Sequence, residues 1–154
     1  IRRERKEVMG SLVEVLKDNG KRKRVLDDCE ALLDAEVADK RGLSGVAVKA
    51  SFKILKKFKS GMIRITLDDM IDDFAVKIDP YWKECQEKGA DPQGFFVSRK
   101  NQVANSLLSI TDERSKVSPN RSVRKAYSSL RPKAVQHIGD AMPRFSRLIQ
   151  KHAS

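Results

Sequence analysis

The sequence has 154 residues, the size of one ordinary domain, and 40% of them are hydrophobic while 34% are charged. This composition is too apolar for a disordered tail. The 32 Lys and Arg outnumber the 21 Asp and Glu, and the net charge of +11 indicates an attraction to polyanions. No apolar run approaches the roughly 18 residues that cross a bilayer, and no signal-type stretch follows the amino terminus, so we expect a cytoplasmic protein.

The positive charge is concentrated in the last third of the chain. Residues 121–154 hold eight Lys and Arg against a single acid, Asp140, so this segment carries +7 of the total +11. A clustered charge focuses the electrostatic potential, whereas a dispersed charge mainly aids solubility. We therefore expect one domain over residues 1–154 with a basic carboxyl-terminal helical segment over 119–154.

Apolar residues recur at three- and four-residue spacing almost throughout, which predicts an all-α bundle of seven or eight helices. The first predicted helix carries a stripe over 8–16 and ends at Asn19-Gly20. The second carries a stripe from Val25 to Val37 and ends at Gly42. Both ends are placed at glycine because it adopts the left-handed conformation that closes a helix.

The third and fourth predicted helices carry opposite charges. The third begins after a Ser44 cap, ends at Gly61 and has a lysine face. That face consists of Lys49, Lys53, Lys56 and Lys57. The fourth, over 62–78, groups Asp68, Asp69, Asp72 and Asp73. If the two helices pack as an antiparallel pair, these charges partly neutralise each other.

Two Asp-Pro pairs have the pattern of a cap followed by proline in the first helical turn. Asp79-Pro80 therefore predicts the start of a short helix that contains Trp82. Asp91-Pro92 predicts the start of a longer helix that includes residues 96–110. A further helix opens within residues 118–120.

The last predicted helix has an apolar stripe from Val135 to Ile149 and contains Pro143. The proline ring collides with the carbonyl four residues earlier, on Gly139. We therefore expect a kink or a break near Pro143.

Three stretches resemble a family of small uncharacterised all-helical proteins from actinobacteria and other bacteria. They are DAEVADK followed by GLSG within 34–45, DPYW at 79–82 and KAYSSLR at 125–131. The resemblance covers roughly residues 26–148. It implies a single all-α domain and carries no activity, substrate or catalytic residue with it.

The basic carboxyl-terminal segment is the candidate binding surface. Phosphate contacts need only Lys and Arg at loose spacing, so the predicted partner is a polyanion, in particular nucleic acid bound through its backbone. The candidate residues are Arg121, Arg124, Lys125, Lys133, Arg144, Arg147 and Lys151. The lysine face of the third helix is a secondary candidate. No motif of a sequence-reading module is present.

The residues do not form a recognisable catalytic or metal-binding constellation. The only histidines are His137 and His152, which is too few for a histidine-rich zinc site, and the aspartates of the fourth helix fit a solvated face. Cys29 and Cys85 belong to no CxxC pair and fit reduced, packed thiols. Phosphate-binding glycine loops and nucleophile elbows are absent from the sequence. We expect no enzymatic activity and no cofactor.

Two other interpretations remain open. The chain could be a protein-interaction or structural module with incidental charge, which a contiguous exposed apolar patch would favour. It could also carry a small apolar ligand. A closed cavity lined by Phe, Leu and Trp82 would favour that interpretation, and a tightly filled core would count against it.

Overall fold

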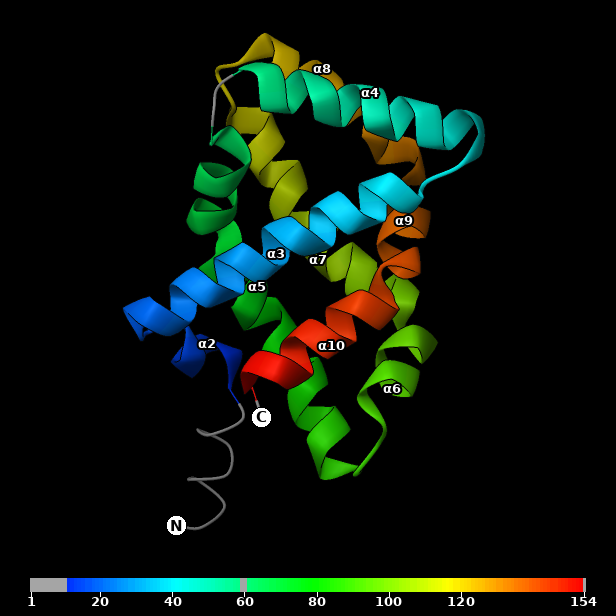
Figure 1. The fold of residues 1–154 in the computed structure, drawn as a ribbon. Helices are drawn as coiled ribbons and strands as arrows, with labels where there is room; N and C mark the ends of the chain where they lie inside the picture. The colour runs from blue at the N-terminus through cyan, green and yellow to red at the C-terminus, as the bar shows by residue number, and fades with distance from the viewer. Residues whose placement is uncertain (1–10, 59–60, 154) are drawn as a thin grey trace.

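The computed structural model describes residues 11–58 and 61–153; the side chains at 43–44 and 54–58 are outside this description. All regular structure in the described ranges is helical, so the predicted all-α bundle is confirmed (Figure 1). The helices are α2 (Leu12–Val15), α3 (Asn19–Asp39), α4 (Gly42–Phe58), α5 (Met62–Glu87), α6 (Pro92–Ser98), α7 (Lys100–Val117), α8 (Arg121–Leu130), the 3-10 helix η1 (Arg131–Lys133), α9 (Ala134–Asp140) and α10 (Met142–Ala153).

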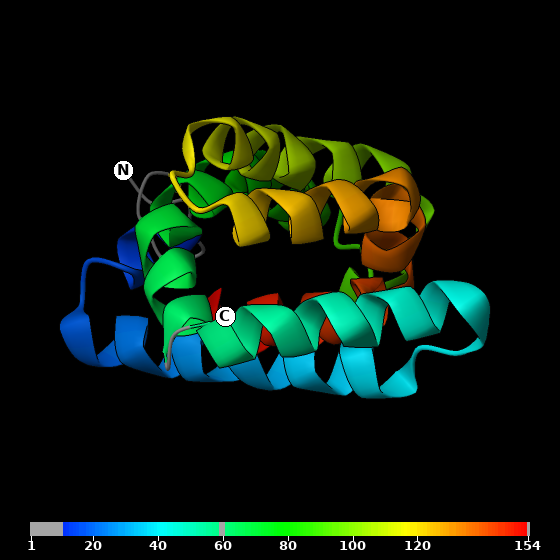
Figure 2. The same ribbon diagram turned by 90° about the horizontal axis from the view of Figure 1, so that it is seen from above.

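Pairs of packed helices surround the centre of the bundle. Helix α10 packs against α3 and α6, and α5 packs against α7. Helices α4 and α8 run antiparallel and side by side across one end of the molecule (Figure 1). Seen from above that end, α4 lies in front of α3, and α8 lies in front of α7 (Figure 2). The α4 and α8 pair therefore covers one end of the bundle.

Short polar side chains start several helices as the sequence predicts. Asp91 accepts a hydrogen bond from the amide of Gly94 at 3.0 Å, and Pro92 is the first residue of α6. Asn120 caps α8 by accepting from the amide of Val123 at 3.1 Å. Each cap satisfies an amide that has no partner inside its own helix.

The predicted helix start at Asp79-Pro80 is wrong, because α5 continues through Pro80 to Glu87. Ile78 and Trp82 are 1% and 4% exposed, and their burial on both sides of the proline keeps the helix continuous. Asp79 does act as a cap, but for another helix. Its carboxylate accepts from the amides of Leu12 and Val13, at 2.7 and 3.1 Å, at the start of α2.

Three other predicted boundaries are also wrong. Gly20 does not end the first helix, since Asp18 caps α3 and places Gly20 in its first turn; residues 1–10 of that predicted stripe are outside the described ranges. Ser44 does not precede the third helix, since α4 begins at Gly42, whose φ of 72° only glycine adopts freely. The predicted helix over residues 96–110 is interrupted at Arg99, between α6 and α7.

The predicted break near Pro143 is confirmed. Helix α9 ends at Asp140 and α10 begins at Met142. The break lets Met142 point inward with 0% exposure. The two short helices therefore follow different directions, and the Lys and Arg of these two helices lie on α10 and not on α9.

Two apolar clusters form the core. The larger joins α5, α6, α7 and α10 and contains Trp82, Phe96 and Cys85 among its buried residues. The smaller joins α2, α3 and α5 around Val25 and Ile71. Both cysteines are free, as the sequence predicts.

Candidate functional site

An apolar cavity of about 420 Å³ occupies the middle of the bundle between the helices that pack in pairs. Side chains from α2, α3, α4, α5, α7, α8, η1, α9 and α10 line it, and its surface is almost entirely apolar. The cavity opens in part to the surface. Every described helix except α6 therefore contributes to its walls.

Aromatic and leucine side chains contribute to the cavity wall, together with Val, Ile and Ala. They include Phe52, Phe74, Phe145, Leu32, Leu33, Leu67, Leu107, Leu130 and Leu148. Trp82 is not among the lining residues, because it packs in the larger core cluster. The Phe and Leu lining expected of an apolar-ligand carrier is thus present, but the cavity is partly open and Trp82 is not in its wall.

Two titratable side chains in the cavity walls are shielded from water. Burial raises the pKa of the Cys29 thiol to about 12, and burial is also the main reason that the pKa of Tyr127 rises to about 12. Both side chains line the cavity. A low-dielectric surrounding disfavours their charged forms, so both groups are neutral at physiological pH.

Polar contacts hold two of the walls in place from outside the cavity. The Tyr127 hydroxyl lies between Thr111, at 2.7 Å, and the carboxylate of Asp112, which also accepts two hydrogen bonds from Arg131. These contacts join α8 and η1 to α7. On the opposite side, Asp28 of α3 accepts from Lys151 at 2.8 Å and pairs with His152 at 2.6 Å.

Three of the seven candidate polyanion-binding residues are engaged inside the molecule. Arg144 forms ion pairs with Glu36 and Asp39, both at 2.6 Å, and Lys151 pairs with Asp28. Arg124 donates to the carbonyl of Ser118 at 2.5 Å. Residues 144 and 151 therefore fasten α10 to α3.

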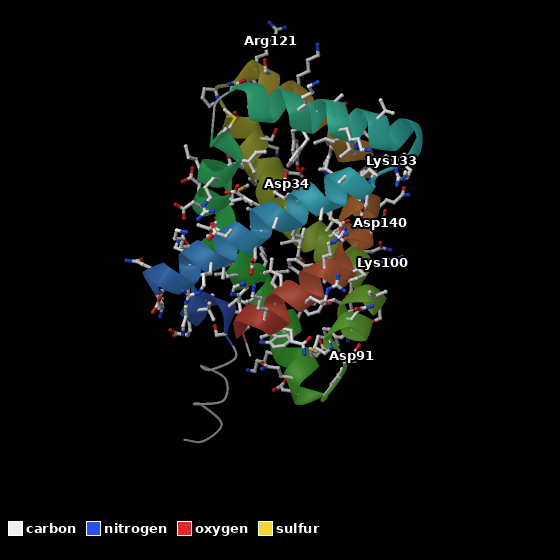
Figure 3. All side chains as sticks on the ribbon, in the orientation of Figure 1. Asp34, Asp91, Lys100, Arg121, Lys133 and Asp140 are labelled. Atoms are coloured by element: carbon white, nitrogen blue, oxygen red, sulfur yellow. The ribbon has the colours of Figure 1, made fainter. Side chains whose placement is uncertain are left out.

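The other four candidates are exposed and form no ion pair with a described residue. They are Arg121, Lys125, Lys133 and Arg147. Arg121 projects outward from the end formed by α4 and α8, and Lys133 lies at the other end of the same layer (Figure 3). Arg147 lies on α10, at a different level of the bundle (Figure 1). The structure thus brings together only part of the predicted surface.

The fold adds the secondary lysine face to that part. Helix α4 packs along α8, so the exposed Lys49 and Lys53 belong to the same layer as Arg121 and Lys125. The side chains of Lys56 and Lys57 are outside the described part of the structure. We call α4, α8 and η1 the basic layer: residues 42–58 hold four Lys, residues 121–133 hold five Lys and Arg, and neither range contains an acid.

The aspartates of α5 do not neutralise α4 through any described side chain. Arg22 of α3 pairs with Asp68 and Asp72, at 2.9 and 2.8 Å, and Arg114 of α7 pairs with Asp69 at 2.5 Å. The antiparallel neutralisation expected from the sequence stays a prediction, because the side chains of Lys56 and Lys57 lie outside the description. Among the described residues, no group of three potential ligands could hold a metal ion.

Exposed apolar residues are few in the described ranges. The large ones are Val46, Ile65, Val76, Val97 and Val117. They come from α4, α5, α6 and α7, and the protein-interaction interpretation remains a prediction. No described helix has both the length and the apolar character needed to cross a membrane.

Comparison with known proteins gives one match. The model of a family of unknown function, DUF6918, matches residues 12–153. The resemblance to an uncharacterised family is thereby confirmed, while the bacterial origin that it implied stays a prediction. No curated protein and no solved structure matches the chain.

Proposed function

We propose that this chain, which belongs to the DUF6918 family of unknown function, is a non-catalytic protein that binds a small apolar ligand in its central cavity. The observation that carries the proposal is the cavity of about 420 Å³ with almost wholly apolar walls. Ligand pockets have volumes of roughly 300–1,000 Å³ and mostly apolar linings. The cavity has both properties.

The apolar surface of the cavity supports the same conclusion. Because the cavity opens in part to the surface, its walls can contact water when no ligand is bound. A ligand with a hydrocarbon body would remove this surface from water, and burial of apolar surface stabilises by roughly 25 cal/mol per Å². An occupant would therefore stabilise the fold.

The volume also sets the size of the ligand. An apolar cavity of roughly 150 Å³ holds one benzene molecule, so this one has room for a ligand on the order of three times that size. The almost complete lack of polar surface favours a hydrocarbon body over a sugar, nucleotide or peptide.

Binding of an uncharged fluorescent probe, N-phenyl-1-naphthylamine, tests the proposal. We expect saturable binding of one probe per chain and a higher Tm for the complex. Ala134→Leu adds three carbons to the cavity wall and should weaken binding at least about tenfold. Ala31→Leu adds the same carbons to the exposed surface of α3 and should leave binding unchanged. Binding that is not saturable, or equal effects of the two variants, would disprove the cavity as the site.

Polyanion binding is a second candidate function, favoured by the basic layer. The fold places the lysines of α4 beside the cations of α8 without an intervening acid in either segment. Three α5 aspartates, Asp68, Asp69 and Asp72, pair with Arg22 of α3 and Arg114 of α7, outside this layer. Such a surface could neutralise several backbone phosphates of a nucleic acid.

A salt series with duplex and single-stranded nucleic acid tests this second candidate. A triple variant, Lys53→Gln, Arg121→Gln and Lys125→Gln, should lower affinity and reduce the slope of log K against log salt by about 2–3. A matched triple variant at the exposed lysines 21, 77 and 100 removes the same charge elsewhere. No binding even at low salt, or equal losses in both variants, would eliminate the candidate.

A further inference from the structure

A polar pocket of about 330 Å³ adjoins the apolar cavity where the end of α3 approaches α9. It is lined by Glu36, Asp39, Lys40, Arg41, Gln136, His137, Asp140 and Arg144. Three of these residues, Glu36, Lys40 and His137, also line the cavity. The two spaces therefore share a boundary, and Figure 3 shows Asp140 at that side of the molecule.

The side chains at the boundary are mostly covered. Lys40 is 11% exposed and Glu36 is 13% exposed, although both are charged. A buried charge is tolerated when close partners of opposite sign replace the water that it has lost. The distances around Lys40 and Glu36 show which of the two has such partners.

Glu36 and Asp39 have a close cationic partner in the polar pocket, whereas Lys40 has no close anionic one. Arg144 contacts both Glu36 and Asp39 at 2.6 Å. The Lys40 ammonium has only longer contacts, 3.5 Å to Asp140 and 3.8 Å to Glu36, and 3.5 Å to the carbonyl of His137. A charge-assisted hydrogen bond between ammonium and carboxylate is about 2.7–2.9 Å long. Lys40 thus lacks a close counter-ion at the boundary.

Three acids and three cations line the pocket, and Lys40 is the one of these cations that also borders the apolar cavity. Arg41 is exposed and forms no ion pair with any residue of the described ranges. Burial lowers the pKa of His137, the positive charges of Lys40 and Lys133 lower it further, and Asp140 opposes them. The imidazole is therefore neutral at pH 7. The two lysines together change its pKa more than Asp140 does.

We propose that the ligand is a single-chain amphiphile with an anionic head group, whose chain fills the apolar cavity and whose head group binds Lys40 at the boundary, with Arg41 beside it. This inference rests on the proposed apolar-ligand function. An anion placed there would give Lys40 the short contact that it lacks. Fatty-acid carboxylates and single-chain phosphate monoesters share this chemistry.

A series of twelve-carbon ligands distinguishes the head groups. The carboxylate, the phosphate monoester, the alcohol and the trimethylammonium compound compete with N-phenyl-1-naphthylamine at pH 7. We expect at least one anion to bind about tenfold or more tightly than the alcohol, and the cation to bind most weakly. The preferred anion identifies the natural class as carboxylate or phosphate.

Variants at the boundary locate the head group. Lys40→Met keeps the length of the side chain, removes its charge and should abolish the advantage of the anion over the alcohol, measured as the ratio of their dissociation constants. Lys77→Met removes a charge from the exposed surface of α5 and should preserve that advantage. If Lys40→Met does not fold, Arg41→Met, at an exposed position, should reduce the advantage about threefold.

The outcomes separate this inference from the proposed function. If the uncharged probe binds but the anions are no better than the alcohol, or if the cation binds best, the head-group inference is overturned and the apolar cavity stands. If the probe does not bind, calorimetry with the two anions decides: binding that depends on Lys40 supports the inference, and its absence overturns both proposals.

Discussion

The two apolar regions of the bundle differ in how completely they are filled. Around Trp82 and Phe96, the buried side chains that α5, α6, α7 and α10 contribute are at most 5% exposed. In the middle of the bundle, Phe52 and Phe74 are only partly buried and border a cavity of about 420 Å³. Both regions are built from the same kinds of side chain. We infer that the filled region stabilises the fold, whereas the hollow region is available for a ligand.

Matched phenylalanine truncations should separate the two regions most strongly. Phe96→Ala removes a side chain with 0% exposure and should lower the free energy of unfolding by about 3–5 kcal/mol. Phe52→Ala removes a cavity-lining side chain that is only partly buried and should cost about 1–2 kcal/mol. Urea denaturation of ligand-free protein measures both. Equal costs would mean that the cavity collapses in solution.

Enlarging two alanine side chains, one in each region, should change the stability in opposite directions. Ala104 has 0% exposure and does not line the cavity, so Ala104→Leu should overpack the core and lower stability by about 1–3 kcal/mol. Ala134→Leu extends into the cavity and should raise stability by about 0.5–2 kcal/mol. Thermal unfolding of ligand-free protein measures both changes. If Ala134→Leu lowers the stability, the cavity has no free space for the larger side chain.

The carboxylate behind Tyr127 should make the hollow region sensitive to acid. The hydrogen bonds from Arg131, and then from Tyr127, hold the pKa of Asp112 below its ordinary value of 3.8. Because the folded pKa is the lower one, this stabilisation is present above pH 3.8 and is lost as the pH falls through the folded value. Asp112→Asn should cost about 1–2 kcal/mol at pH 7, since the site is partly exposed.

Unfolding of both proteins between pH 7 and pH 2 checks this sign. The difference between wild type and Asp112→Asn should shrink below about pH 4. A difference that is constant over the whole range would show that the carboxylate does not lose its partners on protonation. Asp73→Asn, at an exposed acid without a described partner, is the control.

The smallest expected effect concerns the two thiols. Burial raises the pKa of both, which leaves little of the reactive thiolate. Cys29 lines the cavity, whereas Cys85 is 1% exposed in the filled core. In the Cys85→Ser variant, N-ethylmaleimide should modify Cys29 slowly, and a bound ligand should slow it further. In Cys29→Ser, the remaining thiol should react more slowly still. Mass spectrometry gives both rates, and equal rates would count against access through the cavity.

Much of the fold was predictable from the sequence, because its signals act within a few residues. Apolar spacing predicts the helices, Asp91-Pro92 predicts the start of α6, and Pro143 predicts the break between α9 and α10. The sequence also predicts that Asp79 caps a helix, but it does not show which helix Asp79 caps. That helix, α2, lies more than 60 residues earlier in the chain, and only folding brings the two together.

The candidate sites depended more heavily on tertiary structure. The sequence determined the basic segments, but only the packing of α4 along α8 placed them in one layer. Lys40 and Arg41 were not recognised as site residues; the run of charges from Asp39 to Arg41 at the end of α3 was the one available signal. The apolar stripes show which faces turn inward. Whether those faces meet, as around Phe96, or leave a cavity, as around Phe52, is decided by the positions and angles of whole helices, which depend on all their contacts at once.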